Sequence, residues 1–242
     1  MNRRHTLISA CLGLFAALTL SLASAAPTLA QSGPLAFPGA LGWASATPGG
    51  RGGEIIRVTN LNSEGPGSLR AAIEAEGPRI VVFEVGGVID LEMKTLRLRN
   101  PYITIAGQTA PSPGITLIRG GMDVGGHDVI IQHIRIRPGS ADQGWMSGWD
   151  EDGIATVSAY NVIIDHCSLT WATDENLSAS GPRFTGSTPE EWRRGTSHNI
   201  TFSNNIIAES LAYSTHSKGE HSKGSLIHDN VTGLLIIGNL YA

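Results

Sequence analysis

One short strand-like phrase recurs along the chain, and its spacing limits the folds that the chain can adopt. Each copy is a run of β-branched and other apolar residues bounded by polar turn residues, which is the pattern of a β-strand. The copies span residues 102–107, 127–133, 160–166, 198–204 and 234–239. When they are superposed on Ile105, Ile131, Ile164, Phe202 and Ile237, successive copies lie 26, 33, 38 and 35 residues apart. A constant strand at unequal spacing predicts stacked strands joined by loops of variable length.

A parallel β-helix stacks its strands in this way, because each coil rests on the previous one and buries its inward side chains in a shared column. A β-sandwich has turn signals about every 8 to 12 residues, and these copies recur at longer intervals. Thirty glycines and only 6% aromatic residues also suit many tight turns and thin layers. We therefore predict an all-β fold, a single-stranded parallel β-helix.

Two positions after each aligned apolar residue, the copies carry a small or hydrogen-bonding residue at a turn. These residues are Gly107, His133, His166, Asn204 and Asn239. Equivalent turns of successive coils lie one above the other, so such side chains can form a ladder. We interpret His133 and His166 as ladder residues with satisfied hydrogen bonds rather than as metal ligands or catalytic groups.

The residues before the repeats are predicted to close the N-terminal end of the stack. Residues 67–74 are a helix candidate of about two turns, with Ser68 as its N-cap and apolar residues on one face. Residues 79–85 and 88–91 have the composition of strands. So short a helix is expected to cap a larger element.

The first thirty residues have the composition of a secretory signal peptide. Arg3 and Arg4 provide a basic start, residues 7–22 are largely apolar, and small residues follow. The apolar run is short for a membrane-spanning helix, and no stop-transfer charges follow it. We therefore expect a signal peptide at residues 1–30, a β-helix domain at residues 31–242, and a secreted protein, extracellular or periplasmic. Cleavage is expected at Ala25, Ala26 or Ala30.

The mature chain would keep one cysteine, Cys167, which excludes an internal disulfide and is expected to be buried as an apolar residue. Loss of Arg3 and Arg4 would change the formal charge from −4 to about −6. This charge disfavours nucleic acid as a partner, and an anionic polymer would need cations to mediate its binding. We expect a monomer that does not bind membranes after cleavage of the signal.

Acidic residues lie on both sides of the central strand phrase. Asp150, Glu151 and Asp152 precede it, Asp174 and Glu175 follow it, and no lysine or arginine lies between the two groups. Loops that leave equivalent corners of successive coils project to the same side, so the two groups can meet over one groove. Converging carboxylates repel one another unless protons or a hard cation neutralise them, and calcium is the natural occupant outside the cell. A pair of solvated acidic loops is the alternative interpretation.

A polar loop at residues 213–224 contains the phrase His-Ser-Lys-Gly twice. Lys218 becomes functional if it projects into the groove beside the acids, because calcium and a cationic side chain together suit a polymer of carboxylates. Its alternative role is to keep the loop soluble. His216 and His221 could suggest zinc, but the sequence offers no cysteine and no closely spaced third ligand.

Residues 181–195 form an insertion between coils. Phe184 or Trp192 could stack on sugar rings in a groove wall, and a surface excursion is the alternative. No Gly-x-Ser-x-Gly motif occurs, which excludes a serine-nucleophile elbow.

The phrase from Asp165 to Asn176, Asp-His-Cys-Ser-Leu-Thr-Trp-Ala-Thr-Asp-Glu-Asn, closely resembles bacterial pectate lyases of the polysaccharide lyase family 1 type. The His-Ser-Lys-Gly phrase at residues 216–219 and the early Gly-Gly-Arg-Gly-Gly phrase are similar to the same family, so the resemblance covers nearly the whole mature chain. It implies a right-handed parallel β-helix with a short N-terminal capping helix. Its groove would bind polygalacturonate with Ca²⁺ and cleave the polymer by β-elimination.

Carried over by position, the resemblance implies calcium ligands at Asp152 and Asp174, with Asp150 as a candidate second ligand before the central strand. The family's usual further acid falls at Ser178 here, so Glu175 is taken as its substitute. Lys218 matches the lysine that pairs with a substrate carboxylate. In the family, the metal draws off charge from that carboxylate while an arginine removes the proton at C5.

In the family, the arginine that acts as the base follows on the coil after residues 239–242, where this sequence ends. Arg183, Arg193 and Arg194 match no such motif. The expectation is a lyase domain that is incomplete at its C-terminal end and has weak or no activity. Two other functions stay open: a non-catalytic β-helix that binds polysaccharide or acts as an adhesin, and a polygalacturonase-like hydrolase that uses paired carboxylates without a metal.

Overall fold

The structure is a computed structural model that describes residues 33–242. The expected signal peptide at residues 1–30 and its cleavage positions lie outside the described residues. The part that is described belongs to one compact unit ending at Ala242. Within it, no helix is long and apolar enough to cross a membrane.

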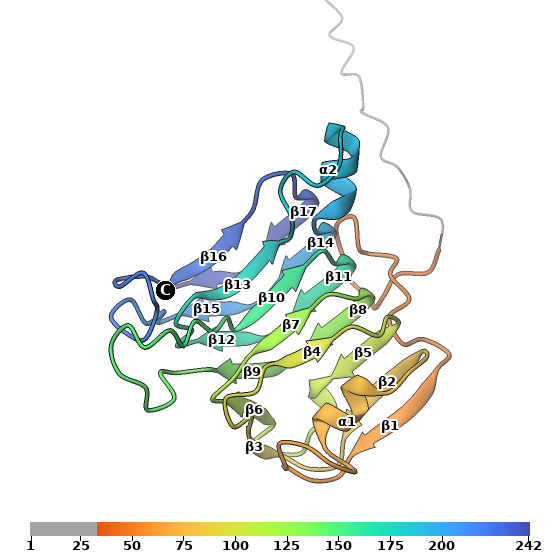
Figure 1. Cartoon of the computed structure of the whole chain (residues 1–242). Helices are drawn as coiled ribbons and strands as arrows, with labels where there is room; N and C mark the ends of the chain where they lie inside the picture. Colours follow the sequence, from red (N-terminus) through yellow and green to blue (C-terminus); the bar gives the residue numbers. More distant parts are fainter. Residues whose placement is uncertain (1–32) are drawn as a thin grey trace, which may run out of the picture. The chain divides into compact units, whose positions relative to one another are not determined.

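Three parallel sheets form the β-helix, and each complete coil contributes one strand to each sheet in turn (Figure 1). The first sheet contains β1 (Glu54–Val58), β2 (Arg79–Phe83), β5 (Ile103–Ala106), β8 (His127–Gln132), β11 (Tyr160–Asp165), β14 (His198–Ser203) and β17 (Thr232–Ile237). The second contains β3 (Gly87–Asp90), β6 (Ile115–Ile118), β9 (Ile134–Arg137), β12 (Ser168–Thr170), β15 (Ile206–Ala208) and β18 (Leu240–Tyr241). The third contains β4 (Leu96–Leu98), β7 (Met122–Val124), β10 (Ile154–Val157), β13 (Glu175–Ser180) and β16 (Lys223–Ile227). The parallel β-helix expected from the sequence is confirmed.

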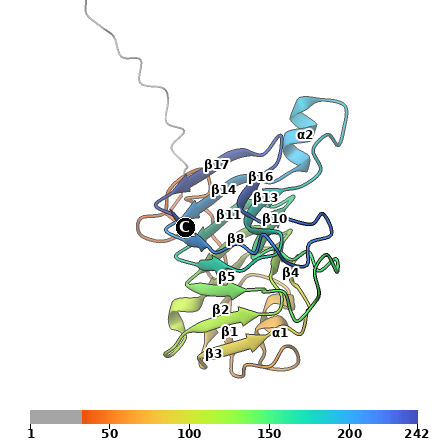
Figure 2. The same ribbon diagram turned by 90° about the vertical axis from the view of Figure 1, so that its left-hand side faces the viewer.

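The core is a column of inward-facing side chains that runs through the stack. In the first sheet, Ile105, Ile131, Ile164 and Phe202 lie in register on successive strands, and all four are fully buried. Figure 2 shows these strands stacked one on another. Because the side chains of a strand alternate between its two faces, a slip of one residue would turn the buried side chains outward. One apolar position per strand is therefore enough to fix the register of each coil on the previous one.

The last copy of the phrase lies one residue away from the register expected from the sequence. Phe202 pairs with Ile236 and not with Ile237, so the offset is 34 residues rather than 35. Residues 234–237 are all apolar, and such a run does not distinguish inward from outward positions. The following turn fixes the register: Gly238 takes a positive φ of 67°, as Asn204 does in the preceding coil with a φ of 55°.

Two ladders therefore run along this corner of the β-helix. His133 and His166 stack with their ring centroids 5.0 Å apart, so they do lie one above the other on successive coils, and His166 Nδ1 lies 2.7 Å from Asp165 Oδ2. Asn239 belongs to the other ladder, because its Oδ1 accepts a hydrogen bond from the backbone N–H of Asn205 at 2.8 Å. Asn205 Oδ1 in turn accepts from the backbone N–H of Cys167. Cys167 is buried as expected, and burial raises the pKa of its thiol to about 12.

A short helix closes the N-terminal end of the stack. Helix α1 (Leu69–Glu74) begins after Ser68, whose hydroxyl accepts a hydrogen bond from the backbone N–H of Ala71 at 3.2 Å. Its apolar face is buried, and the neighbouring Arg79 is fully buried as well. The Arg79 guanidinium donates to the carbonyl oxygens of Ala72 and Ile73, two of the groups that the helix end leaves without intrahelical partners. The capping helix expected from the sequence is confirmed.

The insertion at residues 181–195 contains helix α2 (Pro189–Gly195), which begins with a capping box formed by Thr188 and Glu191. Phe184 and Trp192 pack edge to face, with ring centroids 5.3 Å apart. The insertion follows the C-terminal end of β13, whereas Asp174 precedes the N-terminal end of that strand. Six strand residues span about 20 Å, so these aromatic rings are remote from the acidic residues.

Asp165 links three coils through its carboxylate. Although its residue is only 1% exposed, the carboxylate accepts hydrogen bonds from Gln132 Nε2, His166 Nδ1, Ser203 Oγ and Asn204 Nδ2 at 2.7 to 3.0 Å. Burial alone would raise the pKa of Asp165, but the donors around the carboxylate outweigh burial and lower it. The ionised form is therefore the one that the fold stabilises.

We expect Asp165→Asn to lower the free energy of unfolding by about 2–4 kcal/mol, because an amide turns an N–H₂ group toward donors that need an acceptor. The wild-type contribution is present above the unfolded-state pKa of about 3.9 and is lost as pH falls through the lower folded-state pKa. Urea unfolding between pH 3 and pH 7 measures both effects. Asp229→Asn, at an exposed carboxylate 3.9 Å from Arg183, is the control and should change little. Equal stability of the Asp165 variant and wild type at pH 7 would contradict the role of this network.

Candidate functional site

The acidic residues lie where two neighbouring strands of the third sheet begin. Asp152 lies two residues before the start of β10, and Asp174 lies directly before the start of β13. The two strands pair in parallel with Ile154 opposite Leu177, so both acids lie at the same edge of the sheet. Gly153 allows this approach: its N–H donates to the Glu175 carbonyl oxygen at 2.9 Å, and a Cβ at Gly153 would lie 2.3 Å from the Asn176 carbonyl oxygen.

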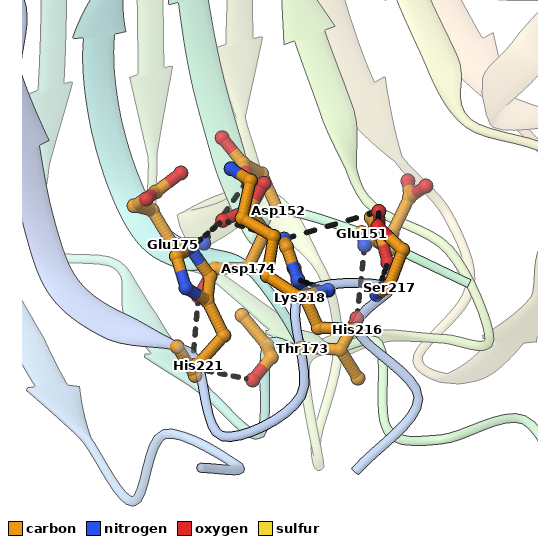
Figure 3. Close-up of polar contacts among 12 residues, drawn as sticks. Glu151, Asp152, Thr173, Asp174, Glu175, His216, Ser217, Lys218 and His221 are labelled. Carbon is orange, nitrogen blue, oxygen red and sulfur yellow. Dashed lines mark hydrogen bonds and ion pairs between the residues drawn. The ribbon is translucent and has the colours of Figure 1, made fainter. Parts of the chain in front are cut away.

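Three carboxylates converge at this edge. Asp152, Asp174 and Glu175 each offer an oxygen, and these atoms lie within 4.8 Å of one another (Figure 3). Asp152 is held in place because its Oδ1 accepts from the Glu175 N–H at 3.1 Å and its Oδ2 accepts from Ser178 Oγ at 2.7 Å. Ser178 stands where the family usually has an acid. Its hydroxyl instead holds Asp152, which precedes the neighbouring strand β10.

The electrostatics of these three carboxylates are unfavourable when no cation is present. Burial raises the pKa of Glu175, and the charges of Asp152 and Asp174 raise it further. Burial also raises the pKa of Asp152, against the opposing effect of its hydrogen bond from Ser178. Three closely spaced carboxylates form a hard, all-oxygen donor set. This set fits Ca²⁺ better than a metal that prefers nitrogen or sulfur.

Asp150 and Glu151 bond to partners outside this trio, although Asp150 Oδ2 lies 3.8 Å from His216 Nε2, the atom that also approaches Asp174. Asp150 accepts from Ser217 N at 2.9 Å and from Ser217 Oγ at 2.7 Å. Burial acts to raise its pKa, but these bonds, with help from His216 and Lys218, lower it. Glu151 is buried and accepts from Thr95 and Gly121 on other coils, so it ties coils together. The ligand role of Asp150 stays a prediction, and it lies beside the three carboxylates rather than among them.

Two stacked histidines cover Asp174, at a ring-centroid distance of 3.9 Å. Nε2 of His221 lies 3.1 Å and Nε2 of His216 lies 3.5 Å from Asp174 Oδ1. Asp174 is far from these histidines in sequence, but the fold brings it beside them as a third potential metal ligand. His216 Nδ1 accepts a hydrogen bond from the Lys218 N–H, so the neutral ring carries its proton on Nε2. With its proton on Nε2, His216 cannot ligate a metal through that atom, so its approach to Asp174 is a close polar contact.

Two lysines, Lys218 and Lys223, flank the acids, and only Lys218 was predicted from the sequence. Lys218 is exposed on the turn that His216 anchors, and its role stays a prediction. Lys223 begins β16 directly opposite Glu175, and its N–H donates to the Asp174 carbonyl oxygen at 3.1 Å. A signal for Lys223 was present: only the second His-Ser-Lys-Gly phrase leads directly into a strand-like run, residues 223–227.

Known proteins with similar sequences share most of this chain. A probable pectate lyase C from Emericella nidulans is 41% identical over 208 residues, covering 86% of this chain and 42% of that protein. One from Aspergillus flavus is 40% identical over 226 residues, covering 93% of this chain and 47% of that protein. The chain is related to the pectate lyases. The resemblance to pectate lyases is confirmed. It is corrected in one respect, because these relatives are fungal, whereas the resemblance was to bacterial pectate lyases.

Two more distant proteins are also similar to this chain, one in sequence and one in structure. A probable pectate lyase 18 from Solanum lycopersicum is 29% identical and covers 63% of this chain and 41% of that protein. The crystal structure of Jun a 1, the major allergen from cedar pollen, is similar with a TM-score of 0.54 and 25% identity, over 70% of this chain and 49% of that one. No family model matches the chain. The chain spans somewhat less than half the length of the curated relatives it matches.

Replacement of Glu175 by Gln should have opposite effects with and without calcium. In chelator at pH 9, above the raised pKa of about 8 for Glu175, we expect the variant to be more stable than wild type by about 1 kcal/mol, or roughly 2–4 °C in Tm, because one repelling charge is gone. For wild type without cation, stability falls as pH rises from the unfolded-state pKa of glutamate, about 4.3, to the folded-state pKa of about 8, and levels off above it. In excess calcium the order should reverse, because the variant loses a ligand charge.

Thermal unfolding in chelator and in calcium measures this reversal. Glu190→Gln, in exposed helix α2, is the matched control and should behave as wild type in both conditions. An undiminished calcium-induced rise in Tm for the Glu175 variant would remove Glu175 from the ligand set.

Proposed function

We propose that this protein is a calcium-dependent pectate lyase that cleaves polygalacturonate by β-elimination. The observation that carries the proposal is the convergence of Asp152, Asp174 and Glu175 from two adjacent coils to within 4.8 Å, beside a turn that bears a lysine. The relationship to pectate lyases supports the same reaction. We also propose a secreted, monomeric protein, in keeping with the apolar segment at residues 7–22 and the net negative charge.

In this mechanism, Asp152, Asp174 and Glu175 would hold the cation, with Asp150 as a candidate outer ligand. A uronate carboxylate beside these residues would then have positive charge next to it, which would favour the negative charge that develops beside C5 as its proton leaves. Asp152 is fixed by Ser178, and Asp174 is fixed by the two histidines, so the ligands are held in position before substrate arrives. Lys218 or Lys223 then pairs with a second carboxylate of the polymer, which sets its register across the site.

The reaction also needs a base for the C5 proton, and the bond from C4 to its oxygen breaks as the double bond forms. We assign this base to none of the described arginines of the insertion. Arg183 lies 3.9 Å from Asp229 and Arg193 lies 3.8 Å from Glu190, both beyond the far end of β13. Cleavage of the polymer needs this base but binding of the polymer does not, so the two are separate measurements.

Product chemistry and chelation separate this function from the alternatives. A lyase releases an unsaturated uronate that absorbs in the ultraviolet, stops in EDTA and resumes with calcium. A polygalacturonase-like hydrolase would continue in EDTA and give saturated ends, because paired carboxylates need no metal. A polysaccharide-binding or adhesin-like β-helix would bind polygalacturonate and release no product.

We expect Asp174→Asn and Asp152→Asn each to lower kcat/KM by about a hundredfold or more, since each removes a charged ligand from the cation. Lys218→Met and Lys223→Met should act mainly through KM, and the larger effect identifies the lysine that contacts substrate. Initial rates of ultraviolet absorbance, with calcium affinity measured by calorimetry, provide the test. Wild-type cleavage that persists in the Asp174 variant would refute the proposed calcium centre.

A further inference from the structure

Two loops that are far apart in sequence pair beside the three carboxylates. Residues 139–150 end at Asp150, the first acid of the first loop, and residues 211–222 carry the two histidines and Lys218. Met146 N donates to the Ser214 carbonyl oxygen at 3.1 Å, and Gly148 N donates to the Thr215 carbonyl oxygen at 2.9 Å. The two loops run side by side in both Figure 1 and Figure 2. Backbone pairing of this kind holds their outer residues in a fixed arrangement.

The paired loops present two aromatic rings to solvent. Trp145 and Tyr213 stack with ring centroids 6.0 Å apart and an angle of 26° between the rings, and we call them the aromatic pair. Trp145 is 54% exposed and Tyr213 is 76% exposed, while the adjacent Met146 is 48% exposed. Large apolar side chains gathered at one exposed site are typical of a binding surface.

The aromatic pair lies next to the turn that bears Lys218. Gly219 has a φ of 84°, and a Cβ built on it would lie 3.8 Å from both Trp145 Cζ2 and Met146 Sδ. The other end of the same turn is fixed to the acids, because Ser217 bonds to Asp150. A polymer held by one carboxylate at Lys218 would therefore bring a neighbouring sugar ring against Trp145.

We propose that the aromatic pair is a binding subsite for the apolar C–H face of a pyranose ring, one position along the uronate polymer from the ring whose carboxylate pairs with Lys218. This inference rests on the proposed function, since it takes the same polymer as its ligand. A pyranose ring has hydroxyl groups at its rim and C–H groups on its faces, so it matches an exposed aromatic ring bordered by polar side chains. The subsite recognises ring shape, whereas the cation and the lysine recognise charge.

The insertion provides a matched control for this subsite. Phe184 and Trp192 are also aromatic neighbours at the surface, and Phe184 is 62% exposed. Their rings meet edge to face at 86°, and Trp192 Nε1 donates to the Gly186 carbonyl oxygen, so they pack mainly against their own loop. They also lie beyond the opposite end of β13 from Asp174. Trp192→Ala therefore removes a half-buried indole without touching the subsite.

Calorimetry with a galacturonate oligomer in calcium tests the inference on the full chain. We expect Trp145→Ala and Tyr213→Ala each to weaken binding roughly threefold to tenfold, with wild-type calcium affinity and wild-type Tm. Trp145→Phe should restore most of the affinity because it keeps a flat ring, and Trp192→Ala should bind as wild type.

Each result has one meaning. Wild-type affinity in both alanine variants would overturn the subsite and leave the proposed function intact. Equal losses in the Trp145 and Trp192 variants would overturn it too, because the effect would not belong to this surface. Absence of calcium-dependent oligomer binding by the wild-type protein would instead refute the proposed function itself.

Discussion

The parallel pairing of β10 with β13 is the constraint on which the candidate site depends. Neighbouring strands of a sheet lie about 4.8 Å apart, so two residues that start successive strands are brought that close whatever their separation in sequence. Asp152 and Asp174 are placed in this way, and the register of Ile154 against Leu177 fixes their relative height. Gly153 makes the approach sterically feasible. The site thus follows from the repeat of the coil and needs no special local structure.

The loops add what the coils cannot supply. A β-helix buries one face of every strand, so its repeating residues are occupied with packing and turn formation, and variation is confined to the connections. In this protein, Asp152 and Trp145 lie in the connection before β10, Asp174 lies in the connection before β13, and Glu175 begins β13 itself. The connection before β16 carries the two histidines, Lys218 and Tyr213. The backbones of the connections before β10 and β16 are joined to each other, for example at Gly148 and Thr215. Chemistry can therefore be concentrated at one edge without disturbing the core.

The sequence was sufficient for the fold wherever a single physical signal repeated. Apolar residues in register on β5, β8, β11 and β14 aligned four coils correctly, whereas the uninterrupted apolar run of β17 did not reveal its own register. The residues of the candidate site were predicted less completely from the sequence. Contacts such as that between Asp174 and His216 join residues from different loops, and no local pattern encodes which loops meet. The aromatic pair was missed for the same reason, since its significance lies in what lies beside it, whereas Lys223 did have a local signal in the strand-like run that it begins.

Asp165 and Glu175 show how one coil can use buried acids in two different ways. Both residues are almost fully buried. Asp165 is surrounded by N–H and O–H donors, its pKa is lowered, and its charge is satisfied within the protein. Glu175 has two carboxylates as its nearest charged neighbours, and burial together with these neighbours raises its pKa. A buried acid with enough donors strengthens the fold, whereas a buried acid among other acids leaves a demand for positive charge that only a proton or a cation from solution can meet. That difference in surroundings, and not burial or residue type, distinguishes the acid that holds the coils together from the acids that we propose bind calcium.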